Sequence, residues 1–162
     1  MKYHNITKCD LKNGEGIRVV LWVSHCEHYC TNCHNPETWN KDSGIPFDLD
    51  AKNELFEELK KDYVSGITLS GGDPLSTLNR EEILLLLKEI KDNFKDKNVW
   101  CYTGYSYEDI KNLKHLEYID VLVDGKYIEK LSKPNPRWRG SYNQRVIDVK
   151  KTLNSEKVYV LV

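Results

Sequence analysis

The apolar residues of this chain fall into short continuous runs, each about as long as a β-strand. Four such runs, rich in branched side chains, occupy residues 17–23, 66–70, 99–103 and 118–123. Continuous apolar runs of this length are typical of strands that are buried on both faces. Two weaker runs, near 145–149 and 157–161, predict two further short strands in the tail.

Between these runs, apolar residues recur at the spacing of an amphipathic helix. A first helix is predicted from residue 48 or 50 to about 61, with an aspartate as its N-cap. A second helix is predicted from Asn79, because Glu82 follows three positions later, as in a capping box. Its apolar face consists of Ile83, Leu86, Leu87, Ile90 and Phe94. A short third helix is predicted over residues 106–113.

Strand and helix therefore alternate three times, which favours a parallel sheet built from right-handed crossovers. A complete eight-stranded barrel needs about 200 residues or more, so a chain of 162 residues is too short to close one. We expect an α/β fold with a partial, incomplete TIM-like barrel, or a curved, mostly parallel sheet with crossover helices. No repeat or linker divides the sequence, so residues 1–162 are predicted to form a single domain.

The charges are nearly balanced, with 24 basic and 25 acidic residues and a net charge of -1. This balance gives no general electrostatic reason to bind nucleic acid or an anionic membrane. No segment approaches the ~20 apolar residues of a membrane span, and the N-terminus lacks a signal-peptide core. We expect a cytoplasmic protein with neither a nucleic-acid nor a membrane partner. Arg137, Arg139 and Arg145 form either a solvated face or a docking surface for a protein.

Three of the five cysteines, Cys26, Cys30 and Cys33, follow directly after the first predicted strand. The spacing Cys-x3-Cys-x2-Cys supplies three sulfur ligands, whereas a closed zinc site uses four protein ligands. A 4Fe-4S cluster held by three cysteines would keep one iron open for a small molecule. The alternative is a zinc site completed by His25, His28 or His34. The spacing favours the cluster, because each histidine lies beside or between the cysteines.

A second motif, Ser70-Gly71-Gly72-Asp73-Pro74, follows the second predicted strand. Carboxyl ends of parallel strands meet at one edge of a sheet, so this turn is expected beside the cysteines. Two glycines allow a ligand to approach the backbone closely, and Pro74 favours an extended conformation at Asp73. Alone, such a turn is weak evidence for ligand binding. Together with the cysteine motif on the preceding strand, it becomes specific evidence for a binding site.

These two motifs resemble those of the radical S-adenosylmethionine family. The resemblance implies that Cys26, Cys30 and Cys33 are the cluster ligands and the catalytic centre. The open iron chelates S-adenosylmethionine, and a reduced cluster cleaves it to a 5'-deoxyadenosyl radical that abstracts a hydrogen atom. The resemblance also implies the cosubstrate contacts: Gly71, Gly72 and Asp73 would receive the methionine amino group, and Asn32, Cys33 and His34 would lie against adenine, with Thr103 nearby. This chain departs from the usual pattern of the family at two positions. Asn32 stands where the family usually has an aromatic residue, and Asp73 stands where it usually has a glutamate.

Further motifs narrow the resemblance to activating proteins of glycyl radical enzymes. They include Cys33-His34-Asn35-Pro36, LSGGDPL from Leu69, and Tyr102-Thr103-Gly104-Tyr105. Together they resemble activators of the anaerobic ribonucleotide reductase. This implies that the protein substrate is the large subunit of anaerobic ribonucleoside-triphosphate reductase, and that a low-potential donor such as flavodoxin supplies electrons. The alternatives are activation of another glycyl radical enzyme, such as pyruvate formate-lyase, or a non-enzymatic zinc or iron-sulfur module.

Overall fold

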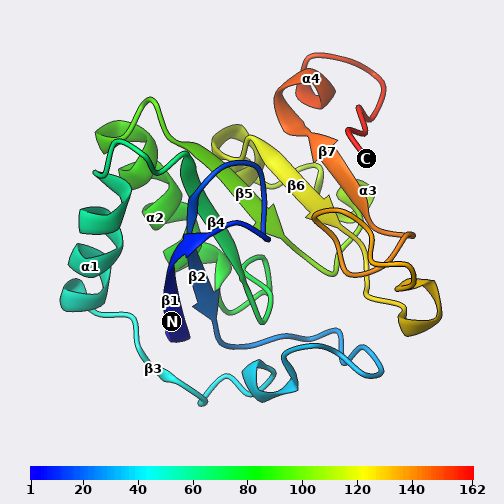
Figure 1. Ribbon diagram of the computed structural model, residues 1–162, viewed down its shortest axis with the longest axis horizontal. Coiled ribbons are helices and arrows are strands. Elements are labelled where there is room, and N and C mark those ends of the chain that lie inside the picture. The colour runs from blue at the N-terminus through cyan, green and yellow to red at the C-terminus, as the bar shows by residue number, and fades with distance from the viewer.

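A computed structural model describes residues 1–162 and contains one seven-stranded sheet with the order β3-β1-β2-β4-β5-β6-β7 (Figure 1). The strands are β1 (Lys2–Asp10), β2 (Arg18–Val23), β3 (Ile45–Pro46), β4 (Gly66–Gly71), β5 (Asn98–Tyr102), β6 (Val121–Asp124) and β7 (Arg145–Asp148). The α-helices are α1 (Leu49–Leu59), α2 (Arg80–Asn93), α3 (Tyr107–Ile110) and α4 (Val149–Leu153). Three short 3-10 helices are η1 (Pro36–Thr38), η2 (Lys114–Tyr118) and η3 (Glu129–Leu131).

The centre of the sheet is parallel and its edges are antiparallel. The pairs β2–β4, β4–β5 and β5–β6 are parallel, whereas β1–β2, β1–β3 and β6–β7 are antiparallel. The expectation of a mostly parallel sheet is therefore right for the centre and wrong for the edges. Strands β3 and β7 end the strand order without pairing with each other, so the sheet is open and a barrel-like closure is not confirmed. The fold is a mixed α/β sheet.

The two faces of the sheet differ in what covers them. Side chains of α1 and α2, including Leu55 and Leu87, pack with Leu21, Ile67 and Leu69 into the main hydrophobic core. Figure 1 shows these two helices beside each other on one side of the molecule. The residues that alternate with these core positions point to the opposite face, where Trp100 belongs to a smaller cluster with Val123 and Val146. That second face is available for a site.

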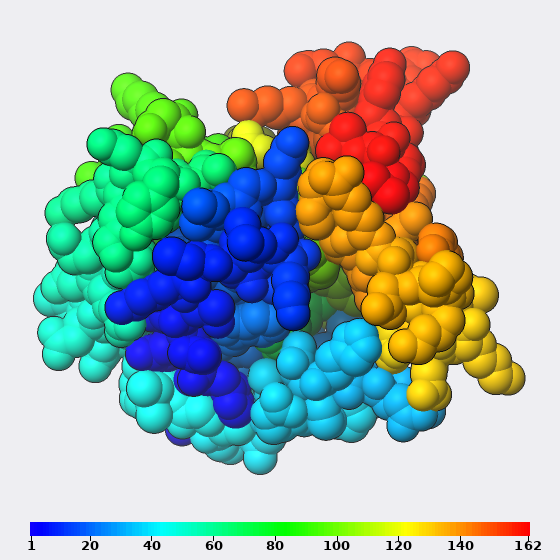
Figure 2. Space-filling model, viewed as in Figure 1, coloured from blue at the N-terminus to red at the C-terminus, as the bar shows by residue number.

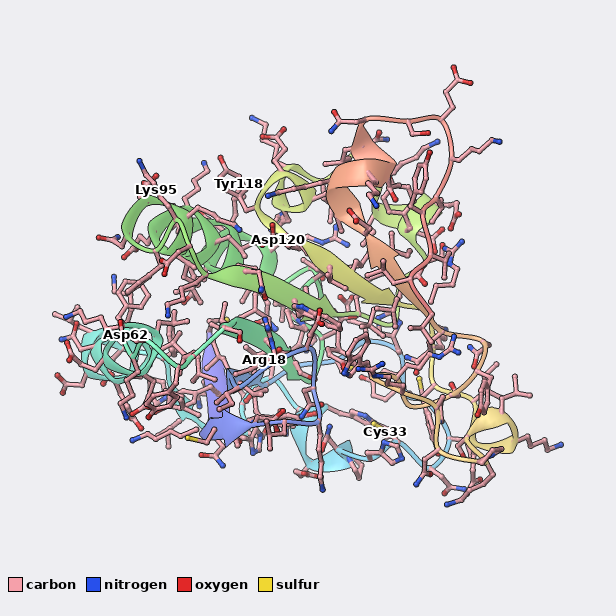
Figure 3. All side chains as sticks on the ribbon, turned by 45° about the horizontal axis from the view of Figure 1, so that its top comes forward. Arg18, Cys33, Asp62, Lys95, Tyr118 and Asp120 are labelled. Atoms are coloured by element: carbon pink, nitrogen blue, oxygen red, sulfur yellow. The ribbon has the colours of Figure 1, made fainter.

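Arg18, on this second face, is a fully buried cation near the centre of the molecule (Figure 3). Its guanidinium donates to Thr68 Oγ1 at 2.8 Å, to the Glu15 carbonyl at 2.9 Å and to the Ile67 carbonyl at 2.8 Å. It also lies over the Trp100 ring, 5.4 Å from the centroid. Burial lowers the pKa of Arg18 to about 10, despite raising effects from nearby acidic groups. The group therefore depends on these neutral acceptors to remain charged inside the protein.

The predicted helices are present, but α3 ends at Ile110 and is shorter than the predicted 106–113, and the cap of α2 differs from the prediction. Asp48 caps α1 and accepts from Ala51 N at 2.9 Å, as expected. Asn79 occupies the N-cap position of α2 but makes no side-chain cap. Its amide instead donates to the carbonyls of Ser24 and Asp73, so it joins the loops after β2 and β4. No helix is both long and apolar enough to cross a bilayer.

Candidate functional site

The cysteine loop (residues 24–44) follows the carboxyl end of β2 and carries all three clustered thiols. Cys26, Cys30 and Cys33 are partly exposed and line one cavity of about 710 Å³. Figure 2 shows this hollow between the light-blue cysteine loop and the orange segment that faces it. Cavities of this size hold small ligands. The three cysteines therefore lie around one cavity at the carboxyl edge of the sheet.

The cysteine loop is held in an unusual backbone conformation. His25, Tyr29 and Asn32 have positive φ angles of 77°, 50° and 55°. Non-glycine residues seldom adopt this region, and a structure keeps them there only when other contacts determine it. Here His25 N donates to the Thr38 carbonyl at 2.7 Å, so the outgoing arm of the loop pairs with its returning arm.

The Gly-Gly-Asp turn after β4 lies directly against the cysteine loop. Gly72 N donates to the Val23 carbonyl at 2.7 Å, and Asp73 N donates to the His25 carbonyl at 2.8 Å. Gly71 has a φ of +102°, and a Cβ there would lie 2.6 Å from the Val23 backbone. A Cβ on Gly72 would lie 2.4 Å from the His25 carbonyl oxygen. The two glycines are therefore needed for the two loops to touch.

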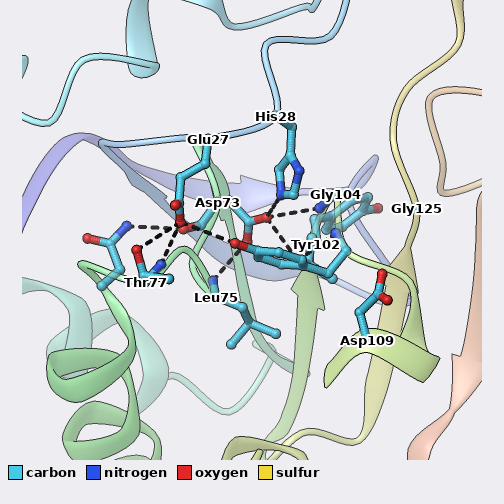
Figure 4. A network of polar contacts seen from close by, with 12 residues as sticks. Glu27, His28, Asp73, Leu75, Thr77, Tyr102, Gly104, Asp109 and Gly125 are labelled. Atoms are coloured by element: carbon cyan, nitrogen blue, oxygen red, sulfur yellow. Dashed lines mark hydrogen bonds and ion pairs between the residues drawn. The ribbon is translucent and has the colours of Figure 1, made fainter. Parts of the chain in front are cut away.

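Asp73 connects the ends of three neighbouring strands through its carboxylate (Figure 4). One oxygen, Oδ2, lies 2.6 Å from His28 Nε2 and accepts from Thr103 Oγ1 at 2.9 Å and from Gly104 N at 3.0 Å. The other, Oδ1, accepts from Leu75 N at 2.8 Å. The residue is only 1% exposed, and both oxygens are engaged by protein groups. The structure therefore gives Asp73 a structural role that its sequence motif did not suggest.

Two of the three histidines of the cysteine loop, His28 and His34, face other residues rather than a shared metal position. His28 is bound to Asp73, and its ring lies edge-on to Tyr105 with centroids 4.5 Å apart. His34 packs against Tyr127 with centroids 4.6 Å apart. These contacts give no support to a zinc site completed by His28 or His34, because such a site needs the histidine to turn towards the cysteines.

The segment of residues 125–144, here called the C-terminal wall, also lines the cavity. Asn32 Nδ2 donates to Glu129 Oε2 at 2.6 Å, which joins the cysteine loop to η3. Tyr102 Oη donates to the Trp138 carbonyl at 2.5 Å, which ties the wall to β5. Sequence reasoning missed these partners, because the asparagine and the glutamate lie 97 positions apart.

Two observations describe the thiols of the metal-free protein. Asn35 N donates to Cys33 Sγ at 3.4 Å, a contact that also suits a thiolate bound to iron. Burial, aided by the charge of Asp73, raises the pKa of Cys26 to about 12, so the metal-free residue is a neutral thiol. Iron binding would displace that proton.

The structure shows no group of three or more metal-binding side chains arranged around a single ion. A four-iron cluster takes each cysteine on a different iron, so its ligands stand farther apart than those of one ion. The three partly exposed thiols line one open cavity and are the type of donor that a 4Fe-4S cluster uses.

Comparison with known proteins defines the class first. A family described as a 4Fe-4S single cluster domain matches residues 12–147, so this chain belongs to the class of single-cluster 4Fe-4S domains. Curated relatives then narrow the class. A protein of Enterobacteria phage T4 is 49% identical, over 90% of this chain and 93% of its own length. Relatives from Haemophilus influenzae and Escherichia coli K12 are 40% and 39% identical, over 89% and 90% of this chain and 96% and 97% of their own lengths. All three are named anaerobic ribonucleoside-triphosphate reductase-activating protein, and this chain belongs to that family.

Proposed function

We propose that this protein activates an anaerobic ribonucleoside-triphosphate reductase, by means of a 4Fe-4S cluster and S-adenosylmethionine. One observation carries the proposal: the loop with the three cysteines and the Gly-Gly-Asp turn are joined by hydrogen bonds beside a single cavity. The relatives named for this activity cover nearly the whole chain, which supports the same target. The protein acts in the cytoplasm, with a low-potential donor such as flavodoxin.

In this proposal Cys26, Cys30 and Cys33 would hold the cluster as its three protein ligands. When bound and reduced, the cluster supplies the electron that cleaves S-adenosylmethionine, and the resulting radical removes a hydrogen atom from a glycine of the reductase. The backbone at Gly71 and Gly72 orients the methionine amino group. Asp73 acts on this group mainly by holding the turn in place, since protein donors occupy both of its oxygens.

The remaining predicted contacts lie around the same cavity. Asn32, Cys33 and His34 line it from the cysteine loop, which suits their expected position against adenine. Thr103 lines it from the end of β5 and donates to Asp73. The sheet is open, and we infer that a loop of the large reductase subunit enters beside these residues.

The test is anaerobic reconstitution with iron and sulfide, followed by reduction and addition of S-adenosylmethionine. We expect 5'-deoxyadenosine and methionine as products. With the reductase present, we expect a glycyl doublet in the electron paramagnetic resonance spectrum. Cys26→Ser, Cys30→Ser and Cys33→Ser should each lose cluster and products. Cys9→Ser is the matched control, because Cys9 is exposed on β1 and outside the cavity, and it should keep both.

Each alternative has its own outcome. Bound zinc without iron, and no cleavage of S-adenosylmethionine, would indicate a metal-binding module. Cleavage with a doublet on pyruvate formate-lyase, but none on the reductase, would assign the protein to a different glycyl radical enzyme. Retention of full activity by any of the three serine variants would rule out the assigned ligand set.

A further inference from the structure

The C-terminal wall concentrates positive charge in a chain that is otherwise acidic. It contains five basic residues and one acidic residue, which gives residues 125–144 a net charge of +4. The whole chain has a net charge of -1, so the remaining residues together carry -5. None of the five basic residues forms an ion pair within the protein. They are Lys126, Lys130, Lys133, Arg137 and Arg139.

The first part of the wall has one side that lines the cavity and another that does not. Tyr127 and Glu129 line the cavity. Their neighbours Lys126, Ile128 and Lys130 are exposed and do not line it. A protein that contacts these outward residues therefore leaves the cavity free for the cosubstrate and for a loop of the reductase.

Two exposed apolar side chains accompany the outward lysines. Ile128 is 43% exposed and Leu131 is 42% exposed, and neither lines the cavity. We call Lys126, Ile128, Lys130 and Leu131 the outer face of η3. Figure 1 shows η3 as the gold turn at the edge of the molecule, beside the light-blue cysteine loop. Protein interfaces commonly combine an apolar centre with a polar rim, and the outer face has both kinds of residue.

The segment that carries the outer face contacts both neighbours of Cys33. Tyr127 packs against His34, which follows Cys33 directly, with ring centroids 4.6 Å apart. On the other side of Cys33, Asn32 Nδ2 donates to Glu129 Oε2 at 2.6 Å. Electron transfer between two proteins becomes faster as their redox centres come closer. The outer face is therefore a short route from the surface to a cluster bound at Cys33.

The sign of the charge indicates which kind of partner this surface fits. Positive charge does not serve S-adenosylmethionine, because the sulfonium of that molecule is itself a cation. It suits an acidic protein, since complementary potentials steer diffusional encounter and raise association rates. Electron-transfer partners form small, short-lived interfaces, and such encounters gain most from electrostatic steering.

We propose that the outer face of η3 is the docking site of an acidic, low-potential one-electron carrier protein that reduces the cluster. This inference rests on the proposed function, since it needs a cluster at the three cysteines. In each encounter the carrier is oxidised by one electron and the cluster is reduced by one electron, and no bond forms or breaks. The carrier and the large reductase subunit then use different surfaces.

The first measurement is the initial rate of 5'-deoxyadenosine formation with reduced flavodoxin, an acidic carrier, as the sole and limiting reductant. At an ionic strength of about 10 mM, Lys126→Glu/Lys130→Glu should lower this rate by about tenfold or more. At about 1 M salt, where charges are screened within ~3 Å, the variant and the wild type should converge.

The matched control is Lys88→Glu/Lys95→Glu, which makes the same change in net charge. Both lysines are exposed, and Figure 3 shows Lys95 at the end of the molecule away from Cys33. This control should keep the wild-type rate with flavodoxin. With excess dithionite, which needs no protein docking, both double variants should cleave S-adenosylmethionine as the wild type does.

The second measurement uses only wild-type protein. A carbodiimide joins a lysine amine to a carboxylate in contact with it, so the reconstituted protein is mixed with flavodoxin at low salt, treated with carbodiimide and analysed by mass spectrometry. We expect cross-links from flavodoxin carboxylates to Lys126 or Lys130, and their loss at high salt. Cross-links confined to other lysines overturn the inference.

Two kinetic results also overturn the inference. One is a wild-type rate with flavodoxin in Lys126→Glu/Lys130→Glu. The other is a variant that keeps this rate and instead lowers the glycyl doublet on the reductase with dithionite as reductant, which would assign the outer face to the reductase.

Failure of the proposed function itself would look different. In that case the wild-type chain would bind no 4Fe-4S cluster, or would not cleave S-adenosylmethionine even with dithionite. If the wild type cleaves S-adenosylmethionine with dithionite and the outer-face variant accepts electrons from flavodoxin as fast as the wild type, only the docking site is wrong.

Discussion

Removal of the Asp73 carboxylate is the most informative perturbation of this fold, because one buried group connects several loops. Asp73→Ala leaves two backbone donors, Leu75 N and Gly104 N, without acceptors. Thr103 and His28 also lose their partner, but a hydroxyl can rotate and an imidazole can move its proton to the other nitrogen. The two backbone groups therefore determine most of the cost.

Each unsatisfied buried donor costs about 1–3 kcal/mol, so Asp73→Ala should lower the free energy of unfolding by about 2–6 kcal/mol. Domains of this kind have a total stability of about 5–15 kcal/mol, so the loss would be large. Asp73→Asn keeps an acceptor for Leu75 N and places an amide group opposite Gly104 N. We expect it to cost about 1–3 kcal/mol, less than the alanine variant.

The assay is urea unfolding of the metal-free, reduced protein, monitored by tryptophan fluorescence, so that neither cluster nor cosubstrate contributes. Asp62→Ala is the control, since Asp62 is an exposed carboxylate that makes no hydrogen bond, and it should change stability by less than about 0.5 kcal/mol. A loss of under about 1 kcal/mol for Asp73→Ala would refute the argument that this carboxylate holds the loops together.

Two further predictions concern residues outside the cavity network. Arg18→Lys should lower the free energy of unfolding, measured in urea, by about 2–4 kcal/mol. The reason is that one ammonium group cannot replace the planar guanidinium that donates to Thr68 and to two carbonyls. A decrease of less than about 0.5 kcal/mol would contradict this reasoning. Burial, together with the charges of Arg80 and Lys88, lowers the pKa of His115 in the folded state. The unfolded chain then binds the proton more readily, so wild-type stability should fall as pH drops below 6.5, and the drop between pH 7.5 and 5.5 should be smaller in His115→Gln.

The central strands were predictable because their sequences are continuous apolar runs. Predicted runs at 17–23 and 66–70 match β2 and β4 almost residue for residue. Strand β1 gave no such signal, because its buried residues Tyr3 and Ile6 are three positions apart. A register shift between Tyr3 and Asn5 explains that spacing, since a bulge breaks the alternation on which strand prediction depends.

The structure of the last part of the chain was harder to predict from its sequence. The predicted strand near 145–149 is β7, but the one near 157–161 reduces to a single bridge between Ile147 and Val160. Of the three arginines considered as a solvated face or docking surface, Arg145 binds the buried Asp124 at 2.5 Å, and Arg139 donates to the Gln144 carbonyl at 2.7 Å. Charge in a sequence does not reveal such internal partners.

In the candidate site, the positions of the motifs were predictable from the sequence, but the contacts between distant segments were not. Strand order alone predicted that the cysteine loop and the Gly-Gly-Asp turn share an edge of the sheet. The contacts that orient them, from His28 to Asp73 and from Asn32 to Glu129, join segments 45 and 97 positions apart. Sequence spacing carries no information on pairs of this kind.

These distant contacts matter because the cysteine loop has little regular structure of its own. Its positive φ angles need support from outside, which comes from Asp73 and from the C-terminal wall. Asp73 also belongs to the turn proposed to hold the cosubstrate, so one carboxylate fixes the separation of turn and cysteines. Reactions between two bound groups depend steeply on their separation and orientation. The buried network around Asp73 is therefore expected to set the reacting geometry before either group binds, which explains why so many donors converge on a residue that faces a cavity.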